Sequence, residues 1–212
     1  MRTHLVTGAG SGIGADLAAR LEARGDEVVR VTRDVVDLSD AAAVHAWAVD
    51  LAARTPRLDS LHHVAGTVEL ATVAELAPAD WERQIAVNLT APAVLTAPLL
   101  PALRAARGTV VLVNSSAGLV ANATWSAYAA SKFGLRAFAD ALRAEEAEHG
   151  VRVTTIFPSR TATPMQEKVH EQEGRTYDAS RWIQPGTVTD SILHILDLPA
   201  DATVPEITLR PR

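Results

Sequence analysis

A tyrosine and a lysine stand four residues apart in the segment Ser126-Ala-Tyr128-Ala-Ala-Ser131-Lys132. On a helix, this spacing places both side chains on one face, one turn apart. A phenol has an ordinary pKa of about 10 and is a poor base at neutral pH, but a nearby ammonium stabilises the phenolate and lowers that pKa. The pair could therefore move a proton to or from a substrate oxygen. An exposed Tyr–Lys pair without a chemical role is the alternative.

A serine stands thirteen residues before Tyr128, where the apolar run 108–114 ends. In a doubly wound sheet, ligands bind at the carboxyl ends of the strands. A hydroxyl at this point could hold a substrate oxygen opposite the phenol. Ser115 and its neighbour Ser116 are chemically equal, so the spacing alone does not choose between them, and an ordinary strand-end serine is the alternative.

A glycine-rich loop, Thr7-Gly8-Ala9-Gly10-Ser11-Gly12-Ile13-Gly14, lies between the first expected strand and the first expected helix. Glycines at this junction let the backbone turn tightly and approach a pyrophosphate, which then meets the helix N-terminus. No Gly-Lys-Ser/Thr follows, so the loop lacks the lysine of a phosphoryl-transfer site. We predict that this loop binds a dinucleotide; a tight turn without a ligand is the alternative.

The second expected strand, 27–32, ends at Thr32 and Arg33 without the acidic residue that usually bonds the ribose 2′-hydroxyl of NAD. The planar guanidinium of Arg33 can pair with a 2′-phosphate instead. Asp34 follows one or two positions too late for that role. The sequence therefore favours NADP(H) over NAD(H), with a solvated strand end as the alternative for Arg33.

Short β-branched runs alternate with longer helical patterns along the chain. The alternation predicts an α/β fold, a doubly wound, Rossmann-like parallel sheet in a single domain of residues 1–212. The expected strands are 4–7, 27–32, 58–65, 108–114, 151–157 and 203–209. The expected helices begin near residues 13, 40, 78, 124 and 187.

Several local signals refine this prediction. Ser39 is expected to cap the second helix, and Gly150 to end the long alanine-rich helix 124–149. The helix that opens at Pro78 is not expected to run unbroken through Pro92, Pro98 and Pro101. The polar stretch 164–186, with Tyr177 and Trp182, is expected to be an irregular lid over the substrate. Trp125 is either a core residue or a substrate wall.

Composition excludes several classes of function. The 212 residues are 48% hydrophobic and 21% charged, with a net charge of −5 and no cysteine. No thiolate nucleophile or cysteine metal site is therefore available, and no basic field for nucleic acid is expected. No metal site is expected at His62-His63, because adjacent strand residues point to opposite faces. Without a signal peptide or a run of about 18 apolar residues, we expect a cytoplasmic protein that does not span a membrane.

Taken together, the glycine loop, Ser115 followed by Ser-Ala-Gly118, and Tyr128-Ala-Ala-Ser-Lys132 resemble the short-chain dehydrogenase/reductase family over nearly the whole chain. The resemblance implies that Tyr128 is the catalytic acid/base. It also implies that Lys132 binds the nicotinamide ribose and lowers the Tyr128 pKa, while Ser115, rather than Ser116, polarises the carbonyl. Asn88 matches the asparagine that holds a proton-relay water.

The same resemblance implies a set of cofactor contacts. Asp37 and Leu38 match the positions that meet the adenine, and Pro158 and Thr163 match those that hold the carboxamide and phosphates. The cofactor-binding residues expected on both grounds are Gly8, Gly10, Ser11, Gly12, Ile13, Gly14, Thr32, Arg33, Asp37, Leu38, Ala65, Gly66, Tyr128, Lys132, Pro158 and Thr163.

Three departures from the family pattern stand out. The family has Asn-Asn-Ala-Gly where this chain has His63-Val64-Ala65-Gly66, so a backbone brace from an amide side chain is expected to be lost. Ser159 replaces a glycine after Pro158. Only three residues separate Arg33 from Asp37, so the usual helix between the second and third strands is expected to be absent.

These observations predict an NADP(H)-dependent oxidoreductase that interconverts an aldehyde or ketone and an alcohol. Hydride would pass between nicotinamide C4 and the carbonyl carbon, with Tyr128 carrying the proton. The alternative is a non-catalytic dinucleotide-sensing or scaffold protein, against which the intact set of Asn88, Ser115, Tyr128 and Lys132 argues. The expected partner is a small carbonyl or alcohol substrate, and a homo-oligomer is compatible with this interpretation.

Overall fold

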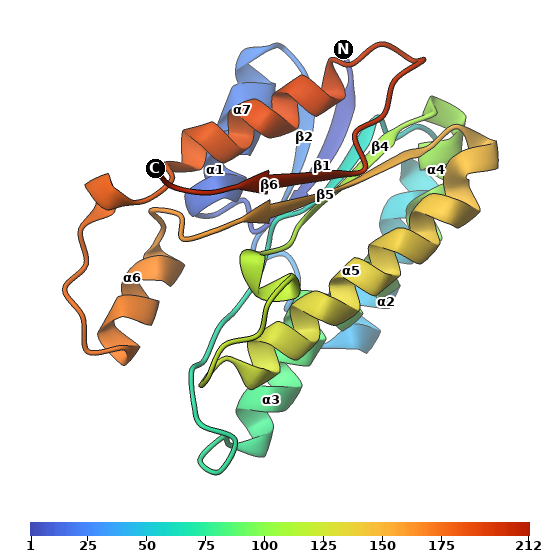
Figure 1. The fold of residues 1–212 in the computed structure, drawn as a ribbon. Helices are drawn as coiled ribbons and strands as arrows, with labels where there is room; N and C mark the ends of the chain where they lie inside the picture. Colours follow the sequence, from blue (N-terminus) through green and yellow to red (C-terminus); the bar gives the residue numbers. More distant parts are fainter.

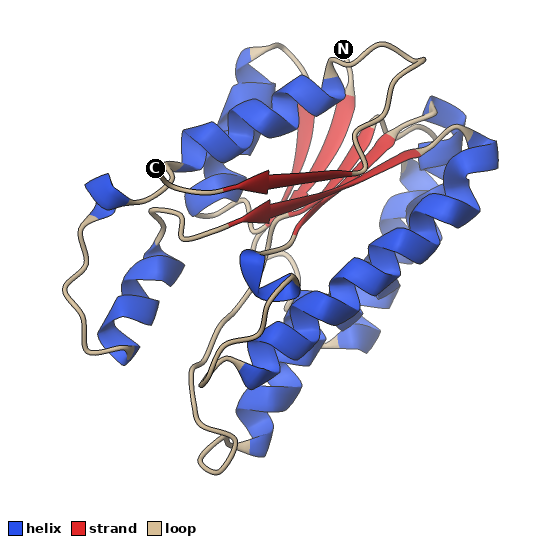
Figure 2. Cartoon of the chain, viewed as in Figure 1, coloured by secondary structure: helices blue, strands red, loops and turns tan.

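The computed structural model describes all 212 residues, and a six-stranded parallel sheet runs through its centre (Figures 1 and 2). The strands are β1 (Thr3–Thr7), β2 (Glu27–Val31), β3 (Ser60–His63), β4 (Thr109–Val113), β5 (Arg152–Pro158) and β6 (Glu206–Leu209). The main helices are α1 (Gly12–Ala23), α2 (Ala41–Arg54), α3 (Pro78–Ile85), α4 (Ala91–Ala106), α5 (Ser126–Glu146), α6 (Pro164–Gln172) and α7 (Pro185–Leu196). The predicted α/β fold is confirmed.

Helices cover both faces of the sheet. Helices α1 and α7 pack on one face, and α2, α4 and α5 pack on the other (Figure 1). Side chains alternate between the two cores along a strand, as the period of two requires. On β1, for example, Leu5 enters the core under α2 and α4, while Val6 enters the core under α1 and α7.

The sheet order β2-β1-β3-β4-β5-β6 places a topological switch between β1 and β3. The chain moves outward from β1 to β2 in one direction and from β1 to β3 in the other. Ligands of open α/β sheets bind in the crevice outside the carboxyl ends of strands at such a point. The glycine loop follows β1 directly, so the fold places it at the mouth of this crevice.

Helices α3 and α4 form one continuous helical segment, joined by a π-helical turn over Ala86–Thr90. The expectation that prolines interrupt it is wrong. Pro92 directly follows the π-helical turn, where the Ala91 N–H bonds the Ala86 carbonyl and the regular i→i−4 ladder is already interrupted. Pro98 is half-buried and Pro101 is exposed, so the carbonyls they leave unpaired can be hydrated.

The segment Pro78–Ala106 is long and apolar enough to cross a membrane by length and composition alone. No such helix was expected from the sequence. In the fold, this segment packs against α2 and α5 and buries Leu95, Leu99 and Leu103 in the core. Its apolar composition is therefore accounted for by its place between the sheet and its neighbouring helices.

Two helix boundaries differ from expectation. Asp40, not Ser39, caps α2, because its Oδ1 accepts the N–H groups of Ala42 and Ala43, both at 3.0 Å. Helix α5 begins at Ser126 rather than Thr124, whose φ of 67° lies in the left-handed region.

The segment between β2 and α2 contains no further helix. Residues 33–35 form a turn, so no helix stands between Arg33 and Asp37. Helix α2 does lie between β2 and β3, so the expectation that no helix separates the second and third strands is wrong.

The stretch 164–186 is not irregular. Thr163 caps α6 and Pro164 occupies its first turn, a helix-start signal that the sequence analysis did not use. A 3-10 turn at Ala179–Arg181 then leads to α7, which begins at Pro185. Nine of the 23 residues of the expected lid therefore form a regular helix beside the carboxyl ends of the strands (Figure 1).

Candidate active site

One cleft of 1540 Å³ opens at the carboxyl ends of the strands. It is lined by the glycine loop, the turn after β2, the segments after β3, β4 and β5, one end of α5 and the inner side of α6. Every residue expected to contact cofactor or substrate lines this cleft except Asn88, which is buried behind its wall. Sequence motifs more than 100 residues apart thus meet in one site.

Tyr128 and Lys132 lie in the first two turns of α5, and both are buried, with exposures of 7% and 3%. The ammonium of Lys132 donates to the carbonyl oxygen of Val113 at 3.1 Å and lies 5.7 Å from the centre of the Tyr128 ring. Ser115, two residues beyond the end of β4, lies close enough to the Tyr128 hydroxyl to hydrogen-bond with it. The fold therefore brings the three side chains to one point of the cleft.

Burial dominates the proton affinities of this pair. It raises the pKa of Tyr128 to about 12, against an opposing influence of Ser115, and lowers the pKa of Lys132 to about 8. In the protein alone, the Tyr128 pKa is therefore raised, and the lowering by the ammonium that the sequence predicted is not found. At neutral pH the phenol carries its proton and is ready to donate it.

Asn88 occupies the π-helical turn, and its side chain is fully engaged with its neighbours. Its Oδ1 accepts the N–H of Thr67 at 2.8 Å, and its Nδ2 donates to the Thr67 carbonyl at 2.9 Å and to Ser131 Oγ at 3.0 Å. Ser131 in turn donates to the Tyr128 carbonyl at 2.7 Å. Asn88 thus joins the segment after β3 to the helix that carries the tyrosine.

Asn114 is a site residue that the sequence analysis missed. Its Nδ2 donates to the Lys132 carbonyl at 2.9 Å, and its Oδ1 accepts the N–H of Ser115 at 2.8 Å. A Cβ on Gly118 would come within 2.4 Å of that Oδ1, so only glycine fits there. Asn114 holds the end of β4 and α5 in fixed relation, and a lone amide at the end of a buried strand was the available signal.

The glycine loop has the shape that a pyrophosphate needs. Gly8 has a φ of 70° and passes so close to Ala65 that a Cβ would meet its Cα at 2.8 Å. Ser11 makes no side-chain cap at the start of α1, so the first N–H groups of that helix have no partner from it and lie along the cleft. Free N–H donors and the positive end of a helix dipole fit a dinucleotide phosphate.

The brace expected to be lost at Val64 is supplied by another strand. Thr7 Oγ1, at the end of β1, accepts the N–H groups of Val64 at 3.0 Å and Ala65 at 3.1 Å and donates to the His62 carbonyl at 3.3 Å. The backbone of Val64 and Ala65 is therefore fixed along the cleft without an amide side chain.

The adenosine end of the cleft carries two cations. Arg33 is exposed on the turn after β2, and Arg83 reaches the same end from α3. The Asp37 carboxylate accepts hydrogen bonds from Ser39, which lower its pKa most, with further lowering by both arginines. Arg83 was not identified from the sequence, because only the tertiary fold brings this residue of α3 near Asp37.

The two tryptophans have different positions. Trp125 lines the cleft, its ring edge-on to Tyr128 at 5.6 Å, so the substrate-wall interpretation fits. Trp182 does not line the cleft; it packs against His170 of α6 at 5.2 Å. Thr163 lies beside the glycine loop, 3.0 Å from where a Cβ on Gly12 would stand, and Pro158 ends β5 in the cleft wall.

Comparison with known proteins agrees with this geometry. Residues 35–174 match the family model described as short chain dehydrogenase. The chain is 34% identical to the D-threitol dehydrogenase of Mycolicibacterium smegmatis over 79% of this chain and 73% of that protein. A short chain dehydrogenase of Shigella flexneri complexed with NADP superposes with a TM-score of 0.87 at 27% identity, covering 98% of this chain and 95% of the other.

A metagenomic short-chain oxidoreductase in complex with NADP superposes with a TM-score of 0.82 at 29% identity, covering 100% and 97% of the two chains. The family match covers well over half of the sequence, and the structural matches span nearly all of it. The chain belongs to the short-chain dehydrogenase/reductase family, whose members are oxidoreductases that act on alcohol and carbonyl groups with NAD(P).

Proposed function

We propose that this protein interconverts an aldehyde or ketone and the corresponding alcohol with NADP(H). In this proposal Tyr128 exchanges the proton, Ser115 holds the substrate oxygen, and Lys132 supports the phenol. The observation that carries it is the meeting of these three side chains beside the glycine loop. Asn88 acts as a positioning residue through Thr67 and Ser131.

The protein's own groups are in the right forms for carbonyl reduction. When bound, the nicotinamide supplies a hydride to the carbonyl carbon or takes one from the alcohol. The buried phenol is protonated at neutral pH and donates to the oxygen as negative charge develops there. The Ser115 hydroxyl donates to the same oxygen, and the Lys132 ammonium stabilises the phenolate that remains.

The preference for NADP(H) rests on Arg33 and Arg83. Both reach the end of the cleft where the adenosine ribose of a dinucleotide would lie, and no strand-end acid precedes Arg33. A guanidinium matches phosphate geometry through paired N–H donors. Two structural relatives above 25% identity were obtained with NADP, which supports the same preference.

The decisive experiment is NADPH consumption across a panel of aldehydes and ketones, compared between the wild type and Tyr128→Phe. The substitution keeps the ring and its packing, so NADPH affinity measured by fluorescence should stay within about twofold. Turnover should fall by about 10²–10⁴-fold, the usual contribution of a general acid. NADPH binding without turnover of any carbonyl would favour the non-catalytic alternative instead.

A further inference from the structure

An apolar cluster forms much of the cleft wall around Tyr128. Val68, Ala117 and Val169 are buried and pack with the tyrosine in one cluster. Leu70, Trp125 and Met165 extend that cluster and are partly buried. These residues come from the segment after β3, the segment after β4 and the inner side of α6.

Several polar side chains of the cleft stand at its rim. Thr72, Glu75, Asn122, Gln172 and Arg175 line the same cleft but are exposed to solvent. Around the phenol itself, the hydroxyl of Ser115 is the polar group that the proposed chemistry uses. A substrate reaching Tyr128 therefore passes a polar rim and enters an apolar inner pocket.

Contacts across the cleft hold the apolar side of α6 in place. The Lys168 ammonium meets Glu69 Oε2 at 2.5 Å and the Val68 carbonyl at 3.4 Å. Gln172, one turn later, accepts the N–H of Leu70 at 3.2 Å. With α6 clasped to the segment after β3, Met165 and Val169 form part of the pocket wall.

We infer that the substrate carries an aromatic or branched aliphatic group beside the reacting carbonyl, rather than a polyhydroxylated chain; this rests on the proposed function. Apolar surface gains free energy on entering such a wall. A hydroxyl buried there finds no partner among Val68, Ala117 and Val169, and an unpaired hydroxyl is disfavoured. The pocket thus selects against sugar-like substrates, unlike the polyol named for the threitol dehydrogenase relative.

The test compares two matched sets of ketones with NADPH, aryl or branched alkyl methyl ketones and hydroxylated ketones such as erythrulose. We expect kcat/KM for the apolar set to exceed that of the hydroxylated set by about 100-fold. Equal or reversed values would overturn the inference while leaving the proposed function intact. Turnover of neither set, with NADPH bound, would contradict the proposed function instead.

A near-isosteric variant locates the source of the preference. Val169→Thr puts a hydroxyl into the pocket wall and should lower the apolar-to-hydroxylated ratio of kcat/KM by about tenfold. Val120→Thr is the control, because Val120 is exposed and does not line the cleft. Its ratio should equal that of the wild type. An unchanged ratio in Val169→Thr, with circular dichroism and NADPH affinity preserved, would also overturn the inference.

Discussion

The phenol of Tyr128 and the ammonium of Lys132 share one buried wall, and burial moves their pKa values apart, that of Tyr128 up to about 12 and that of Lys132 down to about 8. Removing water disfavours both the phenolate and the ammonium. A positive charge next to the phenol would therefore stabilise the phenolate strongly in these poorly hydrated surroundings. The compact ammonium of Lys132 fits there, with its Val113 contact on one side and the tyrosine ring on the other.

Lys132→Arg tests whether that compactness matters. Arginine keeps the charge, but its wide planar fork cannot occupy the space between the Val113 carbonyl and the tyrosine. We expect turnover to fall by at least about 100-fold, with the pH optimum of the remaining activity shifted upward. A pH–rate profile measures both effects. Near-full activity at neutral pH would show that Lys132 has no part in the chemistry.

Arg33→Ala and Arg83→Ala test the cofactor preference. Losing a charge-assisted contact to phosphate is worth about 1.5–3 kcal/mol, or at least about tenfold in affinity. We expect each variant to weaken NADPH binding while barely changing that of NADH. Arg54→Ala on α2 is the control, because the Arg54 side chain is 62% exposed and pairs with Asp50. Equal affinity of the wild type for NADPH and NADH would contradict the proposed preference for NADP(H).

At the scale of elements, α6 is the piece of the fold that closes the substrate side. Besides the Leu70–Gln172 hydrogen bond, two ion pairs anchor it: the Lys168–Glu69 pair across the cleft and the two-point Arg160–Glu173 pair at 2.6 and 2.9 Å near the end of β5. Trp182 packs against His170 of this helix. The helix is therefore positioned by its surroundings on both sides.

Lys168→Met removes the cross-cleft pair while keeping an unbranched side chain. We expect KM for the carbonyl substrate to rise by about three- to tenfold, with NADPH affinity unchanged, because α6 borders the substrate side. Glu167→Gln, an exposed neighbour on the same helix, is the matched control. Combining Lys168→Met with Glu69→Gln should add little further change, since both remove one interaction. If the two substitutions raised KM by fully additive amounts, Lys168 and Glu69 would not be acting through one shared interaction.

The elements also show where sequence reasoning succeeds and where it fails. Local signals sufficed for the glycine loop, the strands and the Tyr128–Lys132 pair, because each depends on spacing within one element. Thr7, Asn114 and Arg83 escaped notice because their roles come from partners far along the chain, such as Val64 and Lys132. Helix α6 was not predicted because its composition is polar, and the helix-start signal Thr163-Pro164 was not recognised.

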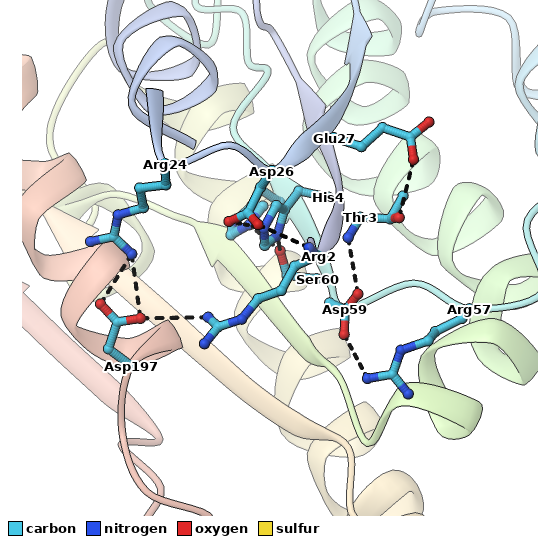
Figure 3. Close-up of polar contacts among 11 residues, drawn as sticks. Arg2, Thr3, His4, Arg24, Asp26, Glu27, Arg57, Asp59, Ser60 and Asp197 are labelled. Atoms are coloured by element: carbon cyan, nitrogen blue, oxygen red, sulfur yellow. Dashed lines mark hydrogen bonds and ion pairs between the residues drawn. The ribbon is translucent and has the colours of Figure 1, made fainter. Parts of the chain in front are cut away.

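At the scale of the whole molecule, the end of the sheet opposite the cleft holds a buried polar chain (Figure 3). His4 Nδ1 lies 2.6 Å from Ser60 Oγ, and His4 Nε2 lies 3.3 Å from Asp26 Oδ2. Ser60 Oγ also lies 2.5 Å from His62 Nε2. His63, next along β3, contacts Thr96 at 2.8 Å. Three histidines are thus buried within two neighbouring strands.

These histidines predict a fold that weakens in mild acid. Burial lowers the pKa of His62 and His63 from 6.5 to about 3, and burial also lowers that of His4. Because the folded pKa values lie below the unfolded value of 6.5, the unfolded chain binds more protons as pH falls through that value. The free energy of unfolding should therefore drop from pH 7 to pH 5, by about 2 kcal/mol for each of His62 and His63.

Urea unfolding at both pH values measures this loss. His63→Asn should reduce the difference between the two pH values, because it removes one of the titrating groups. His45→Gln should leave the difference unchanged, because His45 is exposed on α2. An unfolding free energy that stays level between pH 7 and pH 5 would rule out these histidines as the source of acid sensitivity.

The short turn at residues 33–35 has a consequence for how the protein responds to salt. With no helix between β2 and α2, the Arg33 guanidinium stands in open solvent, as does Arg83 across from it. The Debye length shrinks from about 10 Å at 0.1 M salt to about 3 Å at 1 M, so exposed charges are strongly screened. The KM for NADPH should therefore climb steeply with sodium chloride while that for NADH stays nearly level, and the discrimination between the two nucleotides should narrow as ionic strength rises.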